Sequence, residues 1–240
     1  MSERAVRLLA FDTSTERMAL AVCHGERIVT HEAAGGAQAS ATLIGAIRAL
    51  LAEAGLDAAA LDAVAFGRGP GAFTGLRTAC AVAQGYAFGL GRPALPLDTL
   101  QVVAEDARQR HRVADVWVAM DARMDEIYAA HYRHHGARWH TVEAPALYPL
   151  DALHARWQHG APQAVAGSAL GVFGARLEVS QAQRLPDAAP RAEALASLAL
   201  AAWRAGAGVD AAAALPLYLR DKVALTTAER EAARSARAPG

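Results

Sequence analysis

The sequence predicts an α/β protein of two lobes, each a mixed β-sheet flanked by helices. In the first half, short apolar runs alternate with segments of helical periodicity, in the order of three strands and then helix, strand, helix, strand, helix. The second half restarts the pattern, because an apolar run ending in Asp121 matches an earlier run ending in Asp12. Hydrophobic residues make up 53% of the 240 residues, which is ample for a packed core.

The first three strands are predicted over residues 6–11, 18–22 and 28–31. A polar stretch separates the first strand from the second, and a turn around Gly25 separates the second from the third. Connections this short favour antiparallel pairing of consecutive strands.

Helices then alternate with strands. The first helix is expected to stop at Gly55, and the second is expected to have Thr74 as its cap. The third should carry Glu105 and Asp106 on its solvent side. The predicted elements are helices over 40–54, 76–90 and 99–110 and strands over 63–66 and 93–97. This order is typical of one lobe of the ribonuclease H-like or actin-like class.

The second half is interpreted as a duplicate of the first lobe, although a strand followed by Asp is common in α/β proteins generally. Its predicted elements are strands over 116–120, 127–132 and 164–166 and helices over 150–159 and 191–205. The predicted division of the chain is 1–110 for the first lobe, 111–225 for the second, and 226–240 for a flexible charged tail.

Composition narrows the functional classes. Lys plus Arg and Asp plus Glu are balanced at 24 each, so no overall positive charge is present to track nucleic-acid phosphates. A role in an RNA pathway is therefore expected to be exercised through another protein. The chain starts without the pattern of a signal peptide and has no apolar run of the roughly 18 residues that a membrane span needs, so a cytoplasmic protein is expected. Cys23 and Cys80 are predicted to be buried, reduced thiols.

The glycine-rich stretch at 67–75 has the composition of an anion cradle or of a site where another chain segment approaches closely. It is not a Walker loop, because Leu76 replaces the required Lys. A dinucleotide fingerprint fits loosely on Gly67, Gly69 and Ala72, with Asp98 as the ribose acid, but Pro70 removes an amide from the cradle. A nucleotide- or dinucleotide-binding enzyme stays an alternative, as does a tight connection without a ligand.

The segment after the first strand resembles the first phosphate loop of actin-like ATPases. It lacks the glycine of such loops, and the matching loop after Asp121 carries long side chains where phosphate needs bare backbone. We therefore interpret the two loops as a weakened or lost nucleotide site. Its candidate residues are Asp12, Thr13, Ser14, Gly69, Gly71 and Asp121.

Metal and hydrolase sites are disfavoured by spacing. Four histidines are close in sequence, at His131, His134, His135 and His140. A strand would not bring neighbouring rings of this set to one face, so no metal site is predicted. The candidate parts of a hydrolase are Ser14, Ser40, His24 and His31. No Gly-x-Ser-x-Gly turn accompanies them, and a protease is the weaker alternative.

The helix after the glycine-rich stretch carries small residues at every fourth position, at Ala81, Gly85 and Gly89. Gly costs roughly 1 kcal/mol relative to Ala inside a helix, so these positions need a packing reason. Either the chain's own sheet or a partner helix approaches here, and the sequence leaves both open. The predicted partner interface is Leu43, Ile47, Leu50, Thr74, Arg77, Thr78, Ala81, Gly85 and Gly89.

Four stretches resemble motifs of the TsaB family. They are LAFDTSTE at 9–16, GRGPGAFTGLR at 67–77, DARMDEIY at 121–128 and the closing PLYLR at 216–220. The resemblance implies an actin-like (ASKHA) fold and a role in the N6-threonylcarbamoylation of adenosine 37 in tRNAs that read codons beginning with A. Two positions depart from the family pattern, since Gln38 stands where a His is common and Asp125 where a Gly is common.

The same resemblance implies a scaffold that is not itself an enzyme. In the family's pathway the paralogous TsaD transfers the threonylcarbamoyl group, TsaB dimerises with TsaD through first-lobe helices, and the small ATPase TsaE joins them. A homodimer is implied when the chain is alone. No cofactor or metal is expected, and tRNA is expected to be reached only indirectly, through the complex.

Overall fold

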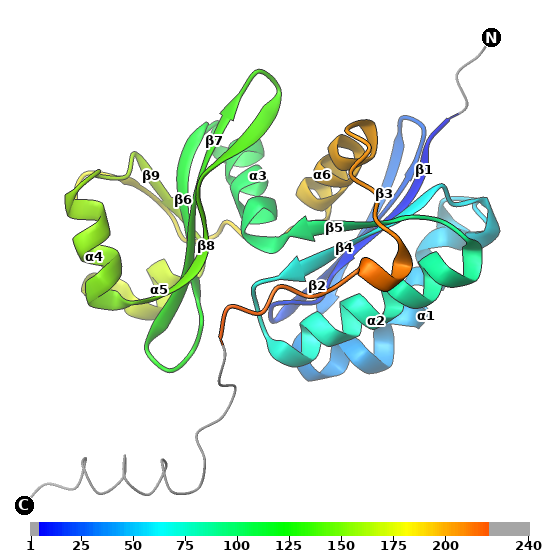
Figure 1. Ribbon diagram of the computed structural model, residues 1–240, viewed down its shortest axis with the longest axis horizontal. Coiled ribbons are helices and arrows are strands. Elements are labelled where there is room, and N and C mark those ends of the chain that lie inside the picture. Colours follow the sequence, from blue (N-terminus) through cyan, green and yellow to red (C-terminus); the bar gives the residue numbers. More distant parts are fainter. Residues whose placement is uncertain (1–4, 221–240) are drawn as a thin grey trace, which may run out of the picture.

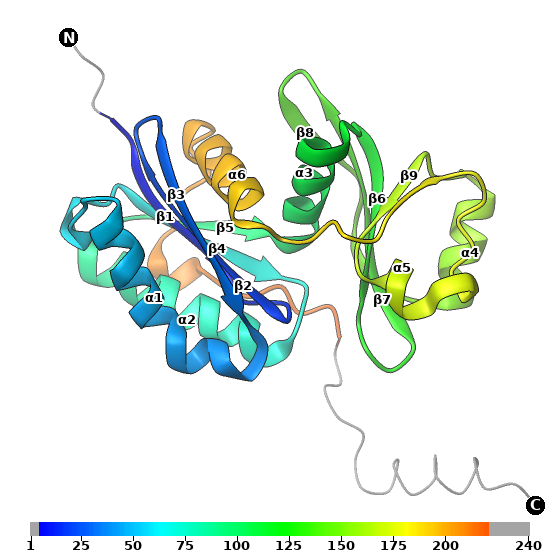
Figure 2. The same ribbon diagram turned by 180° about the vertical axis from the view of Figure 1, so that it is seen from behind.

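The computed structural model describes residues 5–220, which form alternating layers of helices and sheets (Figure 1). Helices α3 (Thr99–His111) and α6 (Ala192–Arg204) lie between two five-stranded sheets, as the view from behind also shows (Figure 2). The prediction of two lobes with a sheet in each is confirmed. The predicted tail at 226–240 lies outside the described residues.

The first sheet is mixed, as predicted. Its strands are β1 (Arg7–Asp12), β2 (Arg17–His24), β3 (Arg27–Ala34), β4 (Ala63–Gly69) and β5 (Ala94–Asp98), in the order β3-β2-β1-β4-β5. The first three pair antiparallel, and β4 joins β1 and β5 in parallel. Alternation along β1 places Leu9 in a core with α1 (Ala39–Glu53) and α2 (Phe73–Leu90), and Leu8 in a core with α6. Both faces of this sheet are therefore buried.

The second sheet repeats this topology. Its strands are β6 (Asp115–Asp121), β7 (Glu126–His135), β8 (Arg138–Pro149), β9 (Ala164–Ala166) and β10 (Gln183–Leu185), in the order β10-β9-β6-β7-β8. In both sheets the third strand of the lobe is at one edge, followed by the second, first, fourth and fifth. The predicted duplication is thus confirmed in the strand order. Helix α3 packs on one face, and α4 (Leu150–Gln158) and α5 (Ala169–Phe173) pack on the other.

After the second sheet, the chain returns to the first lobe. Helix α6 falls within the predicted second lobe, but it packs on β1, β2 and β3 of the first sheet. Val209 then pairs with Ala94 at the edge of the same sheet. The predicted second lobe is therefore too long at its C-terminal end, because the apolar face of α6 completes the first core.

Two acidic residues of α3 are buried, which corrects the sequence-based expectation. Glu105 and Asp106 are each 2% exposed because α3 is covered on both sides. Glu105 accepts hydrogen bonds from Arg108, Trp139 and Ser197. Burial alone would raise the pKa of Glu105, but these bonds outweigh burial and hold it below the ordinary value.

Other local predictions differ at element ends. Helix α2 begins at Phe73, and no side chain caps it, so the exposed Thr74 is not the predicted cap. The edge strand β8 and the short elements α5 and β10 are not predicted from the sequence, because partly exposed or very short segments lack a clear apolar period. Cys23 and Cys80 are free and buried, as predicted. Within residues 5–220, no helix has the length and apolarity to cross a membrane.

Candidate functional site

The loop after β1 is the first candidate site. Asp12 is 1% exposed, and its carboxylate accepts hydrogen bonds from the backbone N–H of Ser14 at 2.7 Å, the hydroxyl of Ser14 at 2.5 Å and the hydroxyl of Thr99 at 2.7 Å. Burial raises the pKa of Asp12, and the bonds from Ser14 and Thr99 oppose this rise without cancelling it. Both carboxylate oxygens therefore have partners inside the protein.

The glycine-rich stretch lies directly against this loop. A Cβ atom at Gly67 would be 2.0 Å from Asp12 Oδ2, and one at Gly75 would be 1.9 Å from the carbonyl oxygen of Thr13. The hydroxyl of Thr13 donates to the carbonyl of Gly75 at 2.7 Å. Since no side chain fits in these spaces, glycine is required by the contact between two segments of the same chain.

Two further glycines belong to the same contact. A Cβ atom at Gly71 would be 2.4 Å from the carbonyl oxygen of Ser14, which accepts a hydrogen bond from the backbone N–H of Ala72 at 2.7 Å. Gly69 has a backbone φ of +106°, a conformation that residues with a side chain rarely adopt, and it faces Leu76. The candidate nucleotide-site residues of the first lobe therefore contact one another or their neighbours, and the close approach is made by the chain itself.

Asp98, the candidate ribose acid of the dinucleotide alternative, caps a helix instead. One carboxylate oxygen accepts from the backbone N–H of Leu100 at 3.0 Å, at the start of α3. The other accepts from the hydroxyl of Tyr132 on β7 at 2.7 Å. Burial raises the pKa of Asp98 against the effect of these bonds. Asp98 thus links the two lobes, and both of its oxygens are engaged.

The matching loop of the second lobe is more exposed. Asp121 accepts from the backbone N–H of Arg123 at 2.9 Å, and Arg123, Met124 and Asp125 have φ of 62°, 56° and 62°. The Arg123 guanidinium reaches across to Glu16 of the first loop at 2.8 Å. Charged side chains therefore fill the space that a bare phosphate-binding backbone would leave open, and at Asp125 the backbone keeps the conformation that favours glycine.

The two loops border a cleft of about 700 Å³ between the lobes. This volume would accommodate a small molecule. The arginines of its wall already have acidic partners, in the pairs Arg17–Glu32, Arg123–Glu16, Arg191–Asp106 and Arg220–Glu126. Among residues 5–220, no group of three or more His, Cys, Asp or Glu is placed to hold a metal ion.

The closing segment, residues 214–220, runs along one side of this cleft. The hydroxyl of Tyr218 accepts a hydrogen bond from Arg77 of α2 at 3.2 Å, and the Tyr218 ring lies 5.1 Å from that of Phe73. Two residues later, Arg220 forms an ion pair with Glu126 of the second lobe at 2.7 Å. The closing segment therefore connects α2 to the start of β7.

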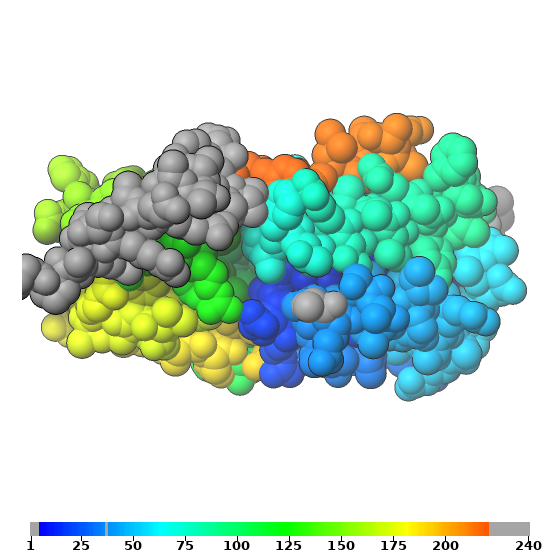
Figure 3. All heavy atoms as spheres, turned by 90° about the horizontal axis from the view of Figure 1, so that it is seen from below, coloured from blue at the N-terminus to red at the C-terminus, as the bar shows by residue number. Residues whose placement is uncertain are grey.

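The outer face of α1 and α2 is the second candidate site. The two helices lie side by side on the surface seen from below (Figure 3). Ala81, Gly85 and Gly89 are exposed on α2, and within residues 5–220 no heavy atom outside the local helix backbone would lie within 4 Å of a Cβ at Gly85 or Gly89. The alternative that the chain's own sheet approaches these glycines is therefore wrong.

An apolar groove of about 530 Å³ follows the small-residue stripe. Its lining residues are Ile44, Ala58, Ala81, Val82, Gly85, Tyr86, Gly89 and Leu90. Ile44 is 52% exposed, and Phe88, on the same helix as the stripe, is 85% exposed. Exposed apolar surface of this kind is typical of protein contact sites. Ile44 and Phe88 are not among the predicted interface residues. Each is an apolar residue outside the buried face of its helix, and this is the signal that could have identified them.

Three predicted interface residues are in the core instead. Leu43, Ile47 and Leu50 are at most 2% exposed and pack against the first sheet, because they form the inner face of α1. They cannot reach a partner in this conformation. Thr74 and Arg77 are exposed on α2. The outward face of α1 presents Ile44, one residue after Leu43.

Among the candidate histidines and serines, His131 and Ser14 have partners that do not form a hydrolase or metal site. His131 stacks on Trp117 with ring centroids 5.2 Å apart, and its Nε2 lies 2.6 Å from a carboxylate oxygen of Asp115. The Ser14 hydroxyl is hydrogen-bonded to Asp12 rather than to a histidine.

Comparisons with known proteins agree with the fold. The family model described as TsaD, tRNA N6-adenosine threonylcarbamoyltransferase, matches residues 26–226. The tRNA threonylcarbamoyladenosine biosynthesis protein TsaB of Escherichia coli K12 is 30% identical over 223 residues, which cover 91% of this chain and 96% of that protein. TsaB of Haemophilus influenzae is 42% identical over 122 residues, about half of each chain.

Solved structures are similar over nearly the whole chain. YeaZ from Pseudomonas aeruginosa superimposes with a TM-score of 0.81 and 38% identity, covering 89% of this chain and 100% of that one. A second P. aeruginosa structure, described as similar to peptidase YEAZ, gives a TM-score of 0.83 and 39% identity, covering 90% of this chain and 100% of that one.

Proposed function

This chain belongs to the TsaB family, and we propose that it serves the synthesis of N6-threonylcarbamoyladenosine at position 37 of tRNA as the non-catalytic partner of a TsaD-type transferase. A relative of nearly equal length is named as a protein of this biosynthesis. The match of this chain to the TsaD family model supports a TsaD-type paralogue of the same fold as the catalytic partner. A TsaE-type ATPase is proposed as the third component, and the cytoplasm as the place of action.

The observation that carries the proposal is the outer face of α1 and α2. Gly85 and Gly89 leave the α2 backbone uncovered, and Ile44 and Phe88 expose apolar surface beside it. A helix pair of the partner can approach such a face closely and bury these side chains. The same face can pair with a second copy, which explains the homodimer expected when the chain is alone.

The condition of the two phosphate-type loops supports a scaffold rather than an enzyme. In the first loop, Asp12 is bound by Ser14 and Thr99, and the glycine-rich stretch occupies the space above the loop. In the second loop, Arg123 occupies the corresponding position through its bond to Glu16. A nucleotide would have to displace these contacts before it could bind between the loops.

Native mass spectrometry of the chain mixed with TsaD from the same genome tests the proposal. We expect a one-to-one complex for the wild type and at least about a tenfold weaker complex for Gly85→Leu, since a leucine would block the stripe. Gly171→Leu is the matched control, because Gly171 lies on α5 and is also exposed, with no heavy atom of the described residues outside its local backbone within 4 Å of its Cβ position. Equal complex formation by both folded variants would contradict the proposed interface.

The alternative of a nucleotide- or dinucleotide-binding enzyme makes a different prediction. Calorimetric titration of the isolated chain with ATP and with NAD should give no tight binding if the loops are closed as described. Micromolar binding of either, lost on substitution of Asp12, would favour the enzyme. Transfer of threonylcarbamoyl groups by the isolated chain would overturn the proposed scaffold role.

A further inference from the structure

Positive charge is concentrated at one end of the second lobe, although the chain as a whole is balanced. Residues 108–115 and 133–140 together contain five arginines, four histidines and a single acidic residue, Asp115. The first segment runs from the end of α3 to the start of β6, and the second is the end of β7, the turn and the start of β8. The net charge of the whole sequence does not reveal this local excess, because acidic residues elsewhere in the chain balance it.

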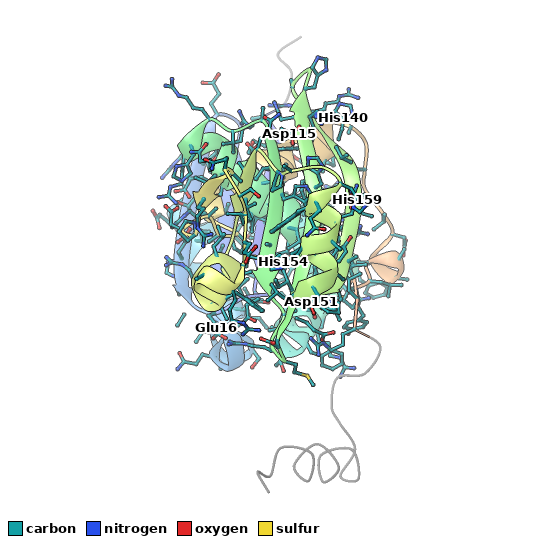
Figure 4. The ribbon with its side chains drawn as sticks, turned by 90° about the vertical axis from the view of Figure 1, so that its left-hand side faces the viewer. Glu16, Asp115, His140, Asp151, His154 and His159 are labelled. Atoms are coloured by element: carbon teal, nitrogen blue, oxygen red, sulfur yellow. The ribbon has the colours of Figure 1, made fainter. Side chains whose placement is uncertain are left out.

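The two segments are adjacent in space. The backbone N–H of His134 donates to the carbonyl of Ala114 at 2.6 Å, and Arg133 Nε donates to Asp115 at 2.8 Å. Figure 4 shows His140 and Asp115 at the same end of the lobe, opposite the end where Glu16 lies. Burial lowers the pKa of His134, and the neighbouring cations, Arg108 foremost, lower it further against the opposite effect of Glu105.

Part of this charge has no acidic partner. Arg108 pairs with Glu105, Arg110 with Asp187 and Arg133 with Asp115. Arg112 and Arg138 are exposed and form no ion pair within residues 5–220. His135 and His140 are exposed beside Arg138 on the same hairpin. We call Arg112, His135, Arg138 and His140 the hairpin patch.

The backbone under the hairpin patch is well anchored. Arg112 ends α3 in the left-handed conformation, and its N–H donates to the carbonyl of Arg108 at 2.9 Å. Trp139, next to Arg138, donates through its ring N–H to Glu105 at 2.9 Å and packs edge-on against Tyr132. The free arginines therefore project from fixed positions.

We propose that the hairpin patch contacts the phosphate backbone of an RNA, and that this RNA is the tRNA bound by the complex of the chain with TsaD. The inference rests on the proposed function for the identity of the RNA. The patch consists of two arginines and two histidines, and no apolar side chain is among its members, which suits phosphate contacts better than a protein interface. It lies at the top of Figure 1, away from α1 and α2 at the bottom, so a partner docked on those helices leaves it open.

The test uses the double variant Arg112→Asn, Arg138→Gln. Asn suits the left-handed backbone at residue 112. The control is Arg27→Gln, Arg92→Gln, which removes two exposed arginines from the first lobe. Each protein is copurified with TsaD, and binding of a fluorescent unmodified tRNA transcript is followed by anisotropy between about 50 and 200 mM KCl.

We expect the patch variant to form the complex normally, to bind tRNA about tenfold more weakly at low salt, and to lower the slope of log K against log salt by about 1.5 to 2. The control should stay within about twofold of the wild type. Two outcomes would overturn the inference and leave the proposed function standing. In the first, the patch variant forms the complex and binds tRNA with unchanged affinity. In the second, the patch variant no longer binds TsaD. If the wild type forms no complex with TsaD, the proposed function fails, and this inference fails with it.

Discussion

The loops after β1 and after β6 occupy equivalent places in the two lobes but have opposite surroundings. The first is buried, and its Asp12 is bound by neighbouring hydroxyls under a glycine-rich stretch. The second is more exposed, and its Arg123 is 71% exposed in the ion pair with Glu16. The backbone of a phosphate-type loop can thus become inaccessible to phosphate in two ways. Another segment of the chain can pack against it, or charged side chains can occupy the space beside it. Only the first way makes the loop a part of the core.

The largest expected effect tests the close packing. Gly75→Ala should lower the free energy of unfolding by about 3 kcal/mol, because its Cβ would lie 1.9 Å from the carbonyl oxygen of Thr13 and the backbone would have to move. Gly85→Ala in the same helix should instead raise it by about 0.5 to 1 kcal/mol, since no atom is near. Urea unfolding followed by circular dichroism measures both. Equal effects of the two substitutions would show that the two segments are not in tight contact.

Removing the two equivalent carboxylates should come next in size. Asp12→Ala leaves the Ser14 N–H and two hydroxyls without an acceptor in a buried place, and we expect a loss of about 2 kcal/mol. Asp121→Ala should cost about 0.5 kcal/mol, because the groups of Arg123 can turn to water. Chemical denaturation of both variants at one pH measures the difference, and a cost for Asp121→Ala as large as that for Asp12→Ala would remove the contrast between the loops.

The pH dependence sharpens the comparison through its sign. Burial raises the pKa of Asp12 in the folded state. The contribution of protonated Asp12 to the free energy of unfolding is therefore fully present below the unfolded pKa, about 3.9, and is lost as the pH rises through the folded pKa. Asp12→Asn mimics that form, so its stability relative to the wild type should increase as the pH rises from about 3.9 through the folded pKa of Asp12.

Asp115, which is partly buried and paired with His131 and Arg133, supplies the opposite case. Burial would raise the pKa of Asp115, but hydrogen bonds and charge from His131 and Arg133 lower it. Its stabilisation is present above the unfolded pKa and is lost as the pH falls through the folded value. Asp115→Asn should therefore lose stability relative to the wild type as the pH rises through the folded pKa of Asp115. The same sign for both variants would contradict the assigned surroundings.

The smallest effect is expected at the bond between the loops. Arg123→Ala removes the ion pair with Glu16, whose side chains are 71% and 78% exposed. Solvent screens such pairs, so the free energy of unfolding should fall by no more than about 0.5 kcal/mol. Thermal melts at low and high salt would detect a larger contribution, which would mean that the second loop is as structural as the first.

Much of the fold follows from periodic patterns in the sequence. The strand runs that end in Asp12 and Asp121 predict two related sheets, and the glycines at 67–75 predict a close approach. The segment that approaches these glycines could not be predicted, because the contact of Gly75 with Thr13 joins segments that are far apart in the sequence. The burial of Glu105 was missed for a similar reason, since a helix between two lobes has two inner faces and does not show the simple amphipathic pattern of a surface helix.

The interface residues show the same limit. Leu43 and Ile44 are adjacent apolar residues of α1, yet only the packing of α1 on the sheet decides that Leu43 points inward and Ile44 outward. The stripe at Gly85 and Gly89 was visible in the sequence, and its exposure was not.

The closing segment makes the proposed docking helix and the far lobe one mechanical unit. Tyr218 is hydrogen-bonded to Arg77 of α2, and Arg220 is paired with Glu126 at the start of β7. The backbone between these two residues therefore links α2 to the second lobe. A partner that shifted α2 along its axis would therefore move the second lobe as well. The width of the cleft between the lobes would then depend on whether a partner is bound to α2.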